Sequence, residues 1–255
     1  MESVGNIYRT SEAIALFDML MAMANYDGVE PQFGNDDIAV VDFHHPILYS
    51  LGVSTVPNDW RVSQEELLMI LTGANMSGKS TFLRQVALTA ILCQVGFRVK
   101  AESARVRIFD RLYTRIGNDD DLDANISTFS MEMLEMADIT KSADGKSLVI
   151  IDELGRGTST VDGTSIACAI CKHLLEHNRC LTLMTTHYTG LVEYLRGFPS
   201  VKPSYLNTDL QSYTAKHTFK LQPGIIKDTP YGISLARQIG LPDTLLQRAE
   251  AIRRQ

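Results

Sequence analysis

The sequence has few cysteines, no long apolar run and no excess of basic residues, and each absence excludes a class of protein. Four cysteines in 255 residues are too few for a disulfide framework, so a reducing compartment is expected. The longest uncharged run around the main predicted helix lies between Arg84 and Arg98, shorter than the ~20 apolar residues of a membrane-spanning helix. The formal net charge of −6 gives no support for nucleic-acid binding by this chain alone.

Apolar periodicity predicts an α/β fold, because short buried strands alternate with amphipathic helices. We expect a largely parallel central sheet flanked by helices. A first helix over 11–24, with Ser11 as its N-cap, is separated from the rest by a segment rich in Gly and Pro. The predicted strands cover 38–43, 67–71, 104–116, 147–152 and 180–186, with a turn at Pro46. The predicted helices cover 80–96, 127–143, 165–177, 231–240 and 242–255.

The segment 212–222 alternates between apolar and polar residues. Such a period of two predicts a strand with one covered face. The residues expected on that face are Tyr213, Ala215, His217, Phe219 and Leu221.

A glycine-rich segment follows the strand predicted over 67–71 and opens the long helix. It satisfies the pattern G-x-x-x-x-G-K-[ST], in the strand-to-helix context that this phosphate-binding motif requires. Its backbone N–H groups and the helix N-terminus favour phosphate, Lys79 is expected to reach the β- and γ-phosphates, and Ser80 to bind Mg²⁺. The residues expected to bind ATP here are Gly73, Ala74, Asn75, Met76, Ser77, Gly78, Lys79, Ser80 and Thr81.

Two further strands end in polar residues. Asp152 and Glu153 close the apolar strand 147–152, at the strand end where ligands bind in open α/β sheets. We expect Asp152 to hold magnesium and Glu153 to orient or deprotonate the attacking water; the alternative is a pair of helix-capping acids. His187 follows the strand 180–186 in the same way and is expected to contact the γ-phosphate or the water, the alternative being a structural histidine.

Five motifs, in this order, are TGANMSGKSTFLRQ, YTRIGNDDDL, STFSMEM, IDELGRGTST and TTH. With them the sequence resembles the ATPase domain of the MutS family of DNA mismatch-repair and recombination proteins, from about Ser11 to the end. The LSGGQ-type signature of transporter ATPases does not occur. The resemblance implies a P-loop NTPase of the ABC-ATPase type that hydrolyses ATP with Mg²⁺ and works as a dimer, with an identical or paralogous subunit.

The resemblance also assigns roles that the residues alone do not. Ser127 matches the signature serine that reaches the partner subunit's γ-phosphate, and residues 155–160 match the loop that couples the two sites. Asn75 falls at the family's phosphate-loop asparagine. Family members with a Phe just before VPND stack it on adenine; Thr55 stands there, so Phe219 is the candidate aromatic face instead.

The implied organisation has three parts. Residues 1–35 would be the end of a preceding, lever-like helical segment, 36–230 the P-loop ATPase domain and 231–255 a C-terminal helix-turn-helix dimerisation element. DNA contact would come from domains outside this chain, which looks like a fragment, and the compartment would be the nucleus. Ser77, where the family usually has glycine, resembles the meiotic, crossover-promoting branch.

Two other functions compete with a MutS-type ATPase. One is a P-loop kinase for a small molecule or nucleoside, for which the sequence lacks an obvious acceptor site or an Arg-rich lid. The other is a nucleotide-binding interaction module without useful turnover, against which Glu153 and His187 argue.

Overall fold

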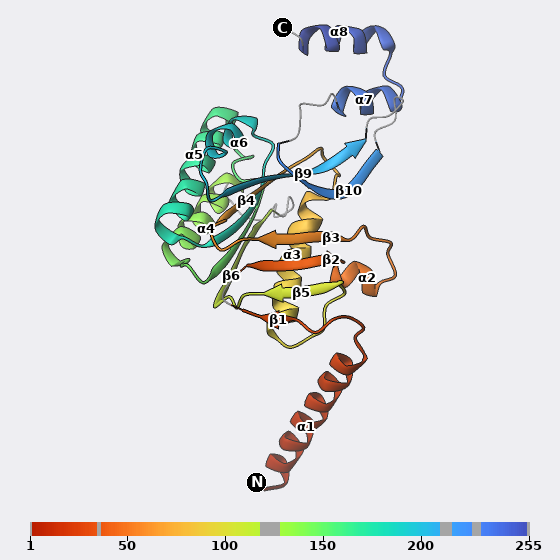
Figure 1. Cartoon of the computed structure of the whole chain (residues 1–255), viewed down its shortest axis with the longest axis vertical. Helices are drawn as coiled ribbons and strands as arrows, with labels where there is room; N and C mark the ends of the chain where they lie inside the picture. The colour runs from red at the N-terminus through yellow and green to blue at the C-terminus, as the bar shows by residue number, and fades with distance from the viewer. Residues whose placement is uncertain (1, 35–36, 118–127, 210–215, 226–230, 254–255) are drawn as a thin grey trace. The chain divides into compact units, whose positions relative to one another are not determined.

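The computed structural model describes residues 2–34, 37–117, 128–209, 216–225 and 231–253 (Figure 1). The chain forms two compact units. The first comprises Met1–Arg61 and Leu88–Ile108, and the second comprises Val62–Ala87 and Phe109–Gln255. Every residue that the sequence predicts to bind ATP or magnesium belongs to the second unit.

The second unit contains a six-stranded sheet with the strand order β10-β9-β4-β8-β7-β6. Neighbouring strands run parallel, except that β10 is antiparallel to β9 at one edge. The predicted α/β fold with a mainly parallel sheet is therefore confirmed, and the antiparallel edge is an addition to it. The strands are β4 (Leu68–Thr72), β6 (Arg111–Ile116), β7 (Ser147–Asp152), β8 (Leu181–Thr185), β9 (Val201–Asp209) and β10 (Lys216–Pro223).

Three helices lie together beside this sheet, α4 (Thr128–Ser142), α5 (Thr160–His173) and α6 (Thr189–Leu195) (Figure 1). Their apolar faces bury alternate residues of the central strands, as the continuous apolar runs of fully buried parallel strands require. A five-residue π-helical turn, η1 (Leu174–Asn178), extends α5, and α7 (Tyr231–Gln238) and α8 (Asp243–Arg253) close the chain. The core between the central strands and the helices α4, α5 and α6 includes Leu68, Ile70, Met136, Ile139, Val149, Ile151, Ala167, Met184, Leu191 and Leu195.

The first unit contains a four-stranded sheet of order β1-β5-β2-β3. Trp60, Phe43 and Val40 are fully buried in it. Its elements are α1 (Glu2–Asn25), β1 (Gln32–Phe33), β2 (Ile38–Phe43), α2 (Pro46–Ser50), β3 (Asn58–Val62) and β5 (Ser103–Val106), and the helix α3 (Lys79–Gln94) starts in the second unit and ends in the first. Among the described residues, no helix is long and apolar enough to cross a membrane.

Three local expectations are wrong. The first helix begins at Glu2, so Ser11 lies inside it and does not cap it. Pro46 starts the short helix α2 in place of a turn, because proline fits the first helical position, where no N–H is needed. The segment 104–116 forms two strands in different sheets, β5 and β6; a residue alternation that continues across the break hides such a switch.

The alternation predicted over 212–222 holds only in part. In β10, His217 pairs with Thr208 and Leu221 with Leu206, so β10 carries extra residues between the two pairs. Phe219 lies in this bulge with φ 55, a left-handed conformation that bulges accommodate. Tyr213 and Ala215 lie outside the described residues. The neighbouring strand β9 was not predicted, because Pro203 and several polar residues interrupt its apolar pattern.

Candidate nucleotide site

The strand order brings the predicted site residues to one edge of the sheet. β8 lies between β4 and β7, and Thr185 is level with both Leu71 and Asp152. Because parallel strands end at the same edge, the segments that follow all three strands meet there. His187, two residues beyond β8, is thereby brought next to Glu153.

The glycine-rich loop, residues 73–80, turns sharply from β4 into α3. Gly73 and Gly78 have φ values of 152 and 99, and Met76, with φ 63, is exposed at the tip. A Cβ on Gly73 would lie 2.8 Å from the Ser77 hydroxyl, so a larger residue does not fit there. Asn75 and Thr81 are also exposed, Ala74, Gly78 and Ser80 are half-buried, and Ser77 and Lys79 are buried.

The Lys79 ammonium lies inside this loop. Its Nζ donates to the carbonyl oxygens of Gly73 (3.0 Å) and Ala74 (3.1 Å) and lies 3.8 Å from Glu153 Oε1. Burial lowers the pKa of Lys79, and the carboxylates of Glu153 and Asp152 oppose that shift. A buried cation therefore faces two acids at the mouth of the loop.

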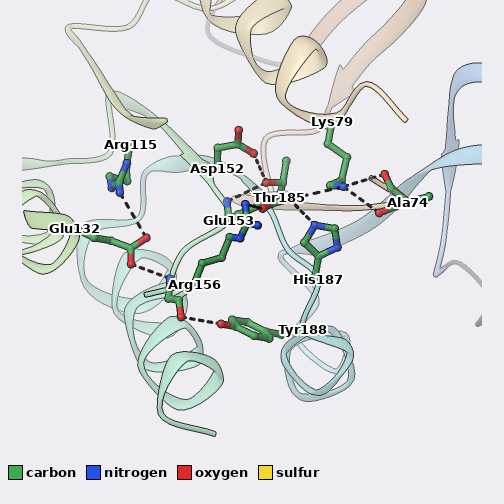
Figure 2. Close-up of polar contacts among 12 residues, drawn as sticks. Ala74, Lys79, Arg115, Glu132, Asp152, Glu153, Arg156, Thr185, His187 and Tyr188 are labelled. Atoms are coloured by element: carbon green, nitrogen blue, oxygen red, sulfur yellow. Dashed lines mark hydrogen bonds and ion pairs between the residues drawn. The ribbon is translucent and has the colours of Figure 1, made fainter. Parts of the chain in front are cut away.

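Both oxygens of the Glu153 carboxylate have a nitrogen partner (Figure 2). His187 Nε2 lies 2.5 Å from Oε1, and Arg156 Nη1 lies 2.8 Å from Oε2. The hydrogen bond with His187, followed by the charges of His187, Lys79 and Arg156, holds the pKa of Glu153 below its usual value despite partial burial. Glu153 therefore stays ionised at neutral pH.

A buried threonine that the sequence reasoning missed joins the two acids. The Thr185 hydroxyl donates to Asp152 Oδ1 at 2.5 Å and accepts the backbone N–H of Glu153 at 3.0 Å. Asp152 and Glu153 thus share one anchor on the neighbouring strand. The only signal for it in the sequence is its place at the end of an apolar strand, two residues before His187.

The loop after β7 has further contacts that no motif indicated. Glu132 of α4 accepts the N–H of Gly155, and Tyr188 donates its hydroxyl to the Gly155 carbonyl (Figure 2). Arg115 of β6 lies 3.8 Å from Glu132. The pattern of a helix face does not reveal that one of its acids is buried against a distant loop.

Phe219 lies against the glycine-rich loop. A Cβ on Gly78 would come within 3.3 Å of the Phe219 ring, which is 44% exposed. The ring of His217 lies 5.8 Å from it. The bulge in β10 therefore presents an aromatic face beside Gly78, the residue that precedes α3.

One predicted site residue, Ser127, lies outside the described residues. In the described ranges, no group of three or more His, Cys, Asp or Glu side chains could hold a metal ion. A magnesium ion at Asp152 would therefore need ligands of other kinds, such as the Ser80 hydroxyl, phosphate oxygens and water.

Comparisons with known proteins identify the family. Residues 69–255 match the family model MutS domain V. The chain is 38% identical to the DNA mismatch repair protein MutS of Natronomonas pharaonis, over 96% of this chain and 29% of that protein. The chain is 40% identical to the DNA mismatch repair protein MutS of Thermotoga maritima, over 95% of this chain and 31% of that protein. It is 37% identical to mouse MutS protein homolog 4, over 100% of this chain and 28% of that protein.

The chain thus spans less than a third of the length of these relatives. Prokaryotic repair proteins and the mammalian homologue match at similar identity, so the comparisons identify the family and not the branch. The resemblance carried by the five motifs is confirmed by a domain match over most of the chain. The chain belongs to the MutS family.

Proposed function

We propose that this chain binds ATP with Mg²⁺ and hydrolyses it, as the ATPase domain of a MutS-type protein. The observation that supports this most is the convergence of the Lys79 ammonium, the Glu153 carboxylate and the His187 imidazole beside a glycine-rich turn that opens a helix. A buried cation can bind the phosphates, and an ionised acid with a neighbouring imidazole can orient and activate a water for phosphoryl transfer.

ATP would bind with its phosphates along residues 73–81. The backbone N–H groups of the turn and the N-terminus of α3 favour anions. Lys79 would exchange its contacts with the Gly73 and Ala74 carbonyls for the β- and γ-phosphates. Phe219 would lie along the base or ribose, since its ring borders the loop at Gly78.

Magnesium would be held by Ser80, in the first turn of α3, and by Asp152. These hard oxygen ligands suit Mg²⁺, which uses few protein groups and completes its shell with phosphate and water. Thr185 fixes one oxygen of Asp152, which fits a carboxylate that must keep one orientation. When bound, the metal neutralises phosphate charge that Lys79 alone does not balance.

Glu153 would orient and deprotonate the attacking water, and His187 would hold the Glu153 carboxylate and stabilise charge at the γ-phosphate. General-base assistance of this kind contributes about 10²–10⁴ in rate. Arg156 binds the second Glu153 oxygen at 2.8 Å and would help to keep the carboxylate ionised until the water attacks.

The whole protein would act on mismatched or recombination-intermediate DNA. ATP would drive a dimer with an identical or paralogous subunit and a conformational change that clamps DNA. Ser127 would complete the partner's site, residues 155–160 would couple the two sites, and residues 231–255 would support dimerisation. DNA contact would come from other domains. Ser77 favours the meiotic recombination branch and a nuclear location.

ATP turnover measured against protein concentration tests this function. Turnover per chain is expected to rise with concentration, because each site needs a second subunit. Each site would combine Lys79 of one chain with Ser127 of the other. A mixture of Lys79→Ala and Ser127→Arg chains should therefore regain activity that neither has alone, because one of the two sites in a mixed dimer keeps both residues. Turnover that is high and independent of dilution would refute completion of the site by a partner, and no turnover at any concentration would favour a nucleotide-binding module.

A P-loop kinase remains the other candidate that shares this loop. Phosphate release from ATP that depends on an added small-molecule acceptor would support it. Release without any acceptor is the result expected for the proposed ATPase.

A further inference from the structure

The Gly155 residue, two positions after Glu153, is held through both of its backbone polar groups. Its N–H donates to Glu132 Oε2 at 3.1 Å, and its carbonyl accepts the Tyr188 hydroxyl at 2.8 Å (Figure 2). The two partners come from different elements: Glu132 from α4, and Tyr188 from the segment between β8 and α6. The three residues form what we call the Gly155 clamp.

Steric fit makes the clamp specific for glycine. Gly155 has φ +87, and a Cβ there would lie 2.9 Å from the backbone of Gly163 in α5. Gly163 in turn has no room for a side chain, because its Cβ would meet the Tyr188 hydroxyl at 2.6 Å. The clamp is thus closed from a third side by α5, and the Gly155 backbone has little freedom to shift.

Glu153 depends on this restraint because its own backbone is strained. It has φ 54, a left-handed conformation that is unfavourable for a non-glycine residue and persists only where the surroundings fix it. Thr185 holds the Glu153 N–H on one side. The clamp holds the chain two residues further on. Without either restraint, the backbone can relax and carry the carboxylate away from its present position.

Tyr188 also restrains His187, the residue that lies against Glu153. It follows His187 directly, so its bond to Gly155 ties the segment that carries His187 to the loop that carries Glu153. The backbone N–H of Tyr188 donates to the Thr186 hydroxyl at 3.0 Å, which fixes the start of this segment. The 2.5 Å approach of His187 to Glu153 therefore lies between two fixed points.

Glu132 is an unusual choice for a helix core position, since it is 4% exposed. A buried carboxylate is tolerated only with partners. It has the Gly155 N–H and the Arg115 guanidinium at 3.8 Å, and Arg115 is itself fixed by Glu135 at 2.8 Å. Breaking such a buried set by removing one member is costly. This set connects α4 to the loop after β7.

We propose that Glu132 and Tyr188 are positioning residues for ATP hydrolysis, which hold Gly155 and thereby keep the Glu153 carboxylate against His187. The inference rests on the proposed ATPase function. Neither side chain needs to touch ATP. Their loss should therefore reduce kcat and leave ATP affinity unchanged, because the phosphate loop has its own restraints in Gly73, Gly78 and Lys79.

Tyr188→Phe is the sharpest variant, because it removes one hydroxyl and keeps the ring. We expect kcat to fall about 10- to 100-fold, as small misplacements of catalytic groups do, with the Kd for ATP within about twofold of the parent. Tyr194→Phe is the matched control: Tyr194 is a half-exposed tyrosine on α6 whose loss of hydroxyl should leave kcat unchanged.

Glu132 is tested by a pair of variants. Glu132→Gln keeps an oxygen that can accept the Gly155 N–H and should retain most of kcat, whereas Glu132→Ala should lose it. Amide hydrogen exchange at Gly155, which requires no turnover, should be slow in the parent and in Glu132→Gln, and faster in Glu132→Ala.

Two results would overturn the inference while the parent chain hydrolyses ATP. One is a kcat for Tyr188→Phe within twofold of the parent, with unchanged Gly155 exchange in Glu132→Ala. The other is a parallel loss of kcat, ATP affinity and melting temperature in Tyr188→Phe, which indicates a general structural role. A parent chain without turnover would instead refute the proposed function, and the exchange data would still report whether the clamp exists.

Discussion

The glycine-rich loop after β4 and the loop after β7 reach the same site by different means. The first is held mainly by its own residues: two glycines with positive φ permit the turn, and Lys79 closes it by bonding to Gly73 and Ala74 within the same loop. The second contains Glu153 in a strained conformation and is held by residues distant in sequence, Glu132 and Thr185 among them. A loop that is fixed locally can be recognised from a motif, whereas a loop fixed from outside cannot.

Removal of the Lys79 ammonium should have the largest effect on ATP binding and turnover. Lys79→Ala is expected to weaken ATP binding strongly and to abolish turnover, because the loop loses both its closing contact and its phosphate ligand. Equilibrium binding of a fluorescent ATP analogue and phosphate release measure the two losses. Lys146→Ala, at an exposed lysine far along the chain, is the control; a Lys79→Ala chain that binds ATP like the parent would show that the glycine-rich loop is not the phosphate site.

A substitution in the loop after β7 should affect the chemical step and leave ATP binding intact. Glu153→Gln keeps the size of the side chain and removes its charge, so turnover is expected to fall by about 10²–10⁴ with ATP binding retained. Single-turnover phosphate release with excess protein measures the chemical step. Glu193→Gln, at an exposed ion pair on α6, should behave as the parent. Equal turnover in both variants would remove Glu153 from the mechanism.

The packing of the loop after β7 against α5 can be tested at Gly155. Gly155→Ala places a Cβ 2.9 Å from Gly163 in a left-handed backbone, and we expect it to destabilise the fold by roughly 1–3 kcal/mol and to lower turnover. Chemical denaturation measures the free energy of unfolding. At Gly197, where a Cβ would meet nothing within 4 Å, alanine should be tolerated; equal stability of the two variants would contradict the close packing of the loop on α5.

The smallest expected effect is a shift of the pH profile. Arg156 helps to lower the pKa of Glu153, so Arg156→Ala should raise that pKa. Because the base works only when ionised, the acid limb of the kcat profile should move to higher pH. Arg196→Ala, which removes a guanidinium from another exposed ion pair, should leave the limb in place. A shift to lower pH would mean that another group controls it.

The same ion pairs contribute to folding. A depressed Glu153 pKa stabilises the folded state above the usual carboxyl pKa, and that contribution is lost as the pH falls through the lowered value. The stability difference between the parent and Arg156→Ala should therefore be present at neutral pH and shrink in acid.

The sequence by itself determined the class of fold and the family. Apolar runs located β4, β7 and β8, and the motifs located the glycine-rich loop and the polar residues at the strand ends. These features are local: a strand needs a run of apolar residues, and a phosphate loop needs glycines and a lysine at fixed spacing.

Only the tertiary structure decided which strands are neighbours and what supports the acids. The insertion of β8 between β4 and β7 explains why His187 reaches Glu153, and no spacing in the sequence states that order. The bulge that brings Phe219 to Gly78 interrupts an alternation that looks regular in the sequence. Thr185, Glu132 and Tyr188 gain their roles from contacts across 23 to 33 residues of chain, because the packing of α4, α5 and β8 against one another, and not any local pattern, brings them to the loop after β7.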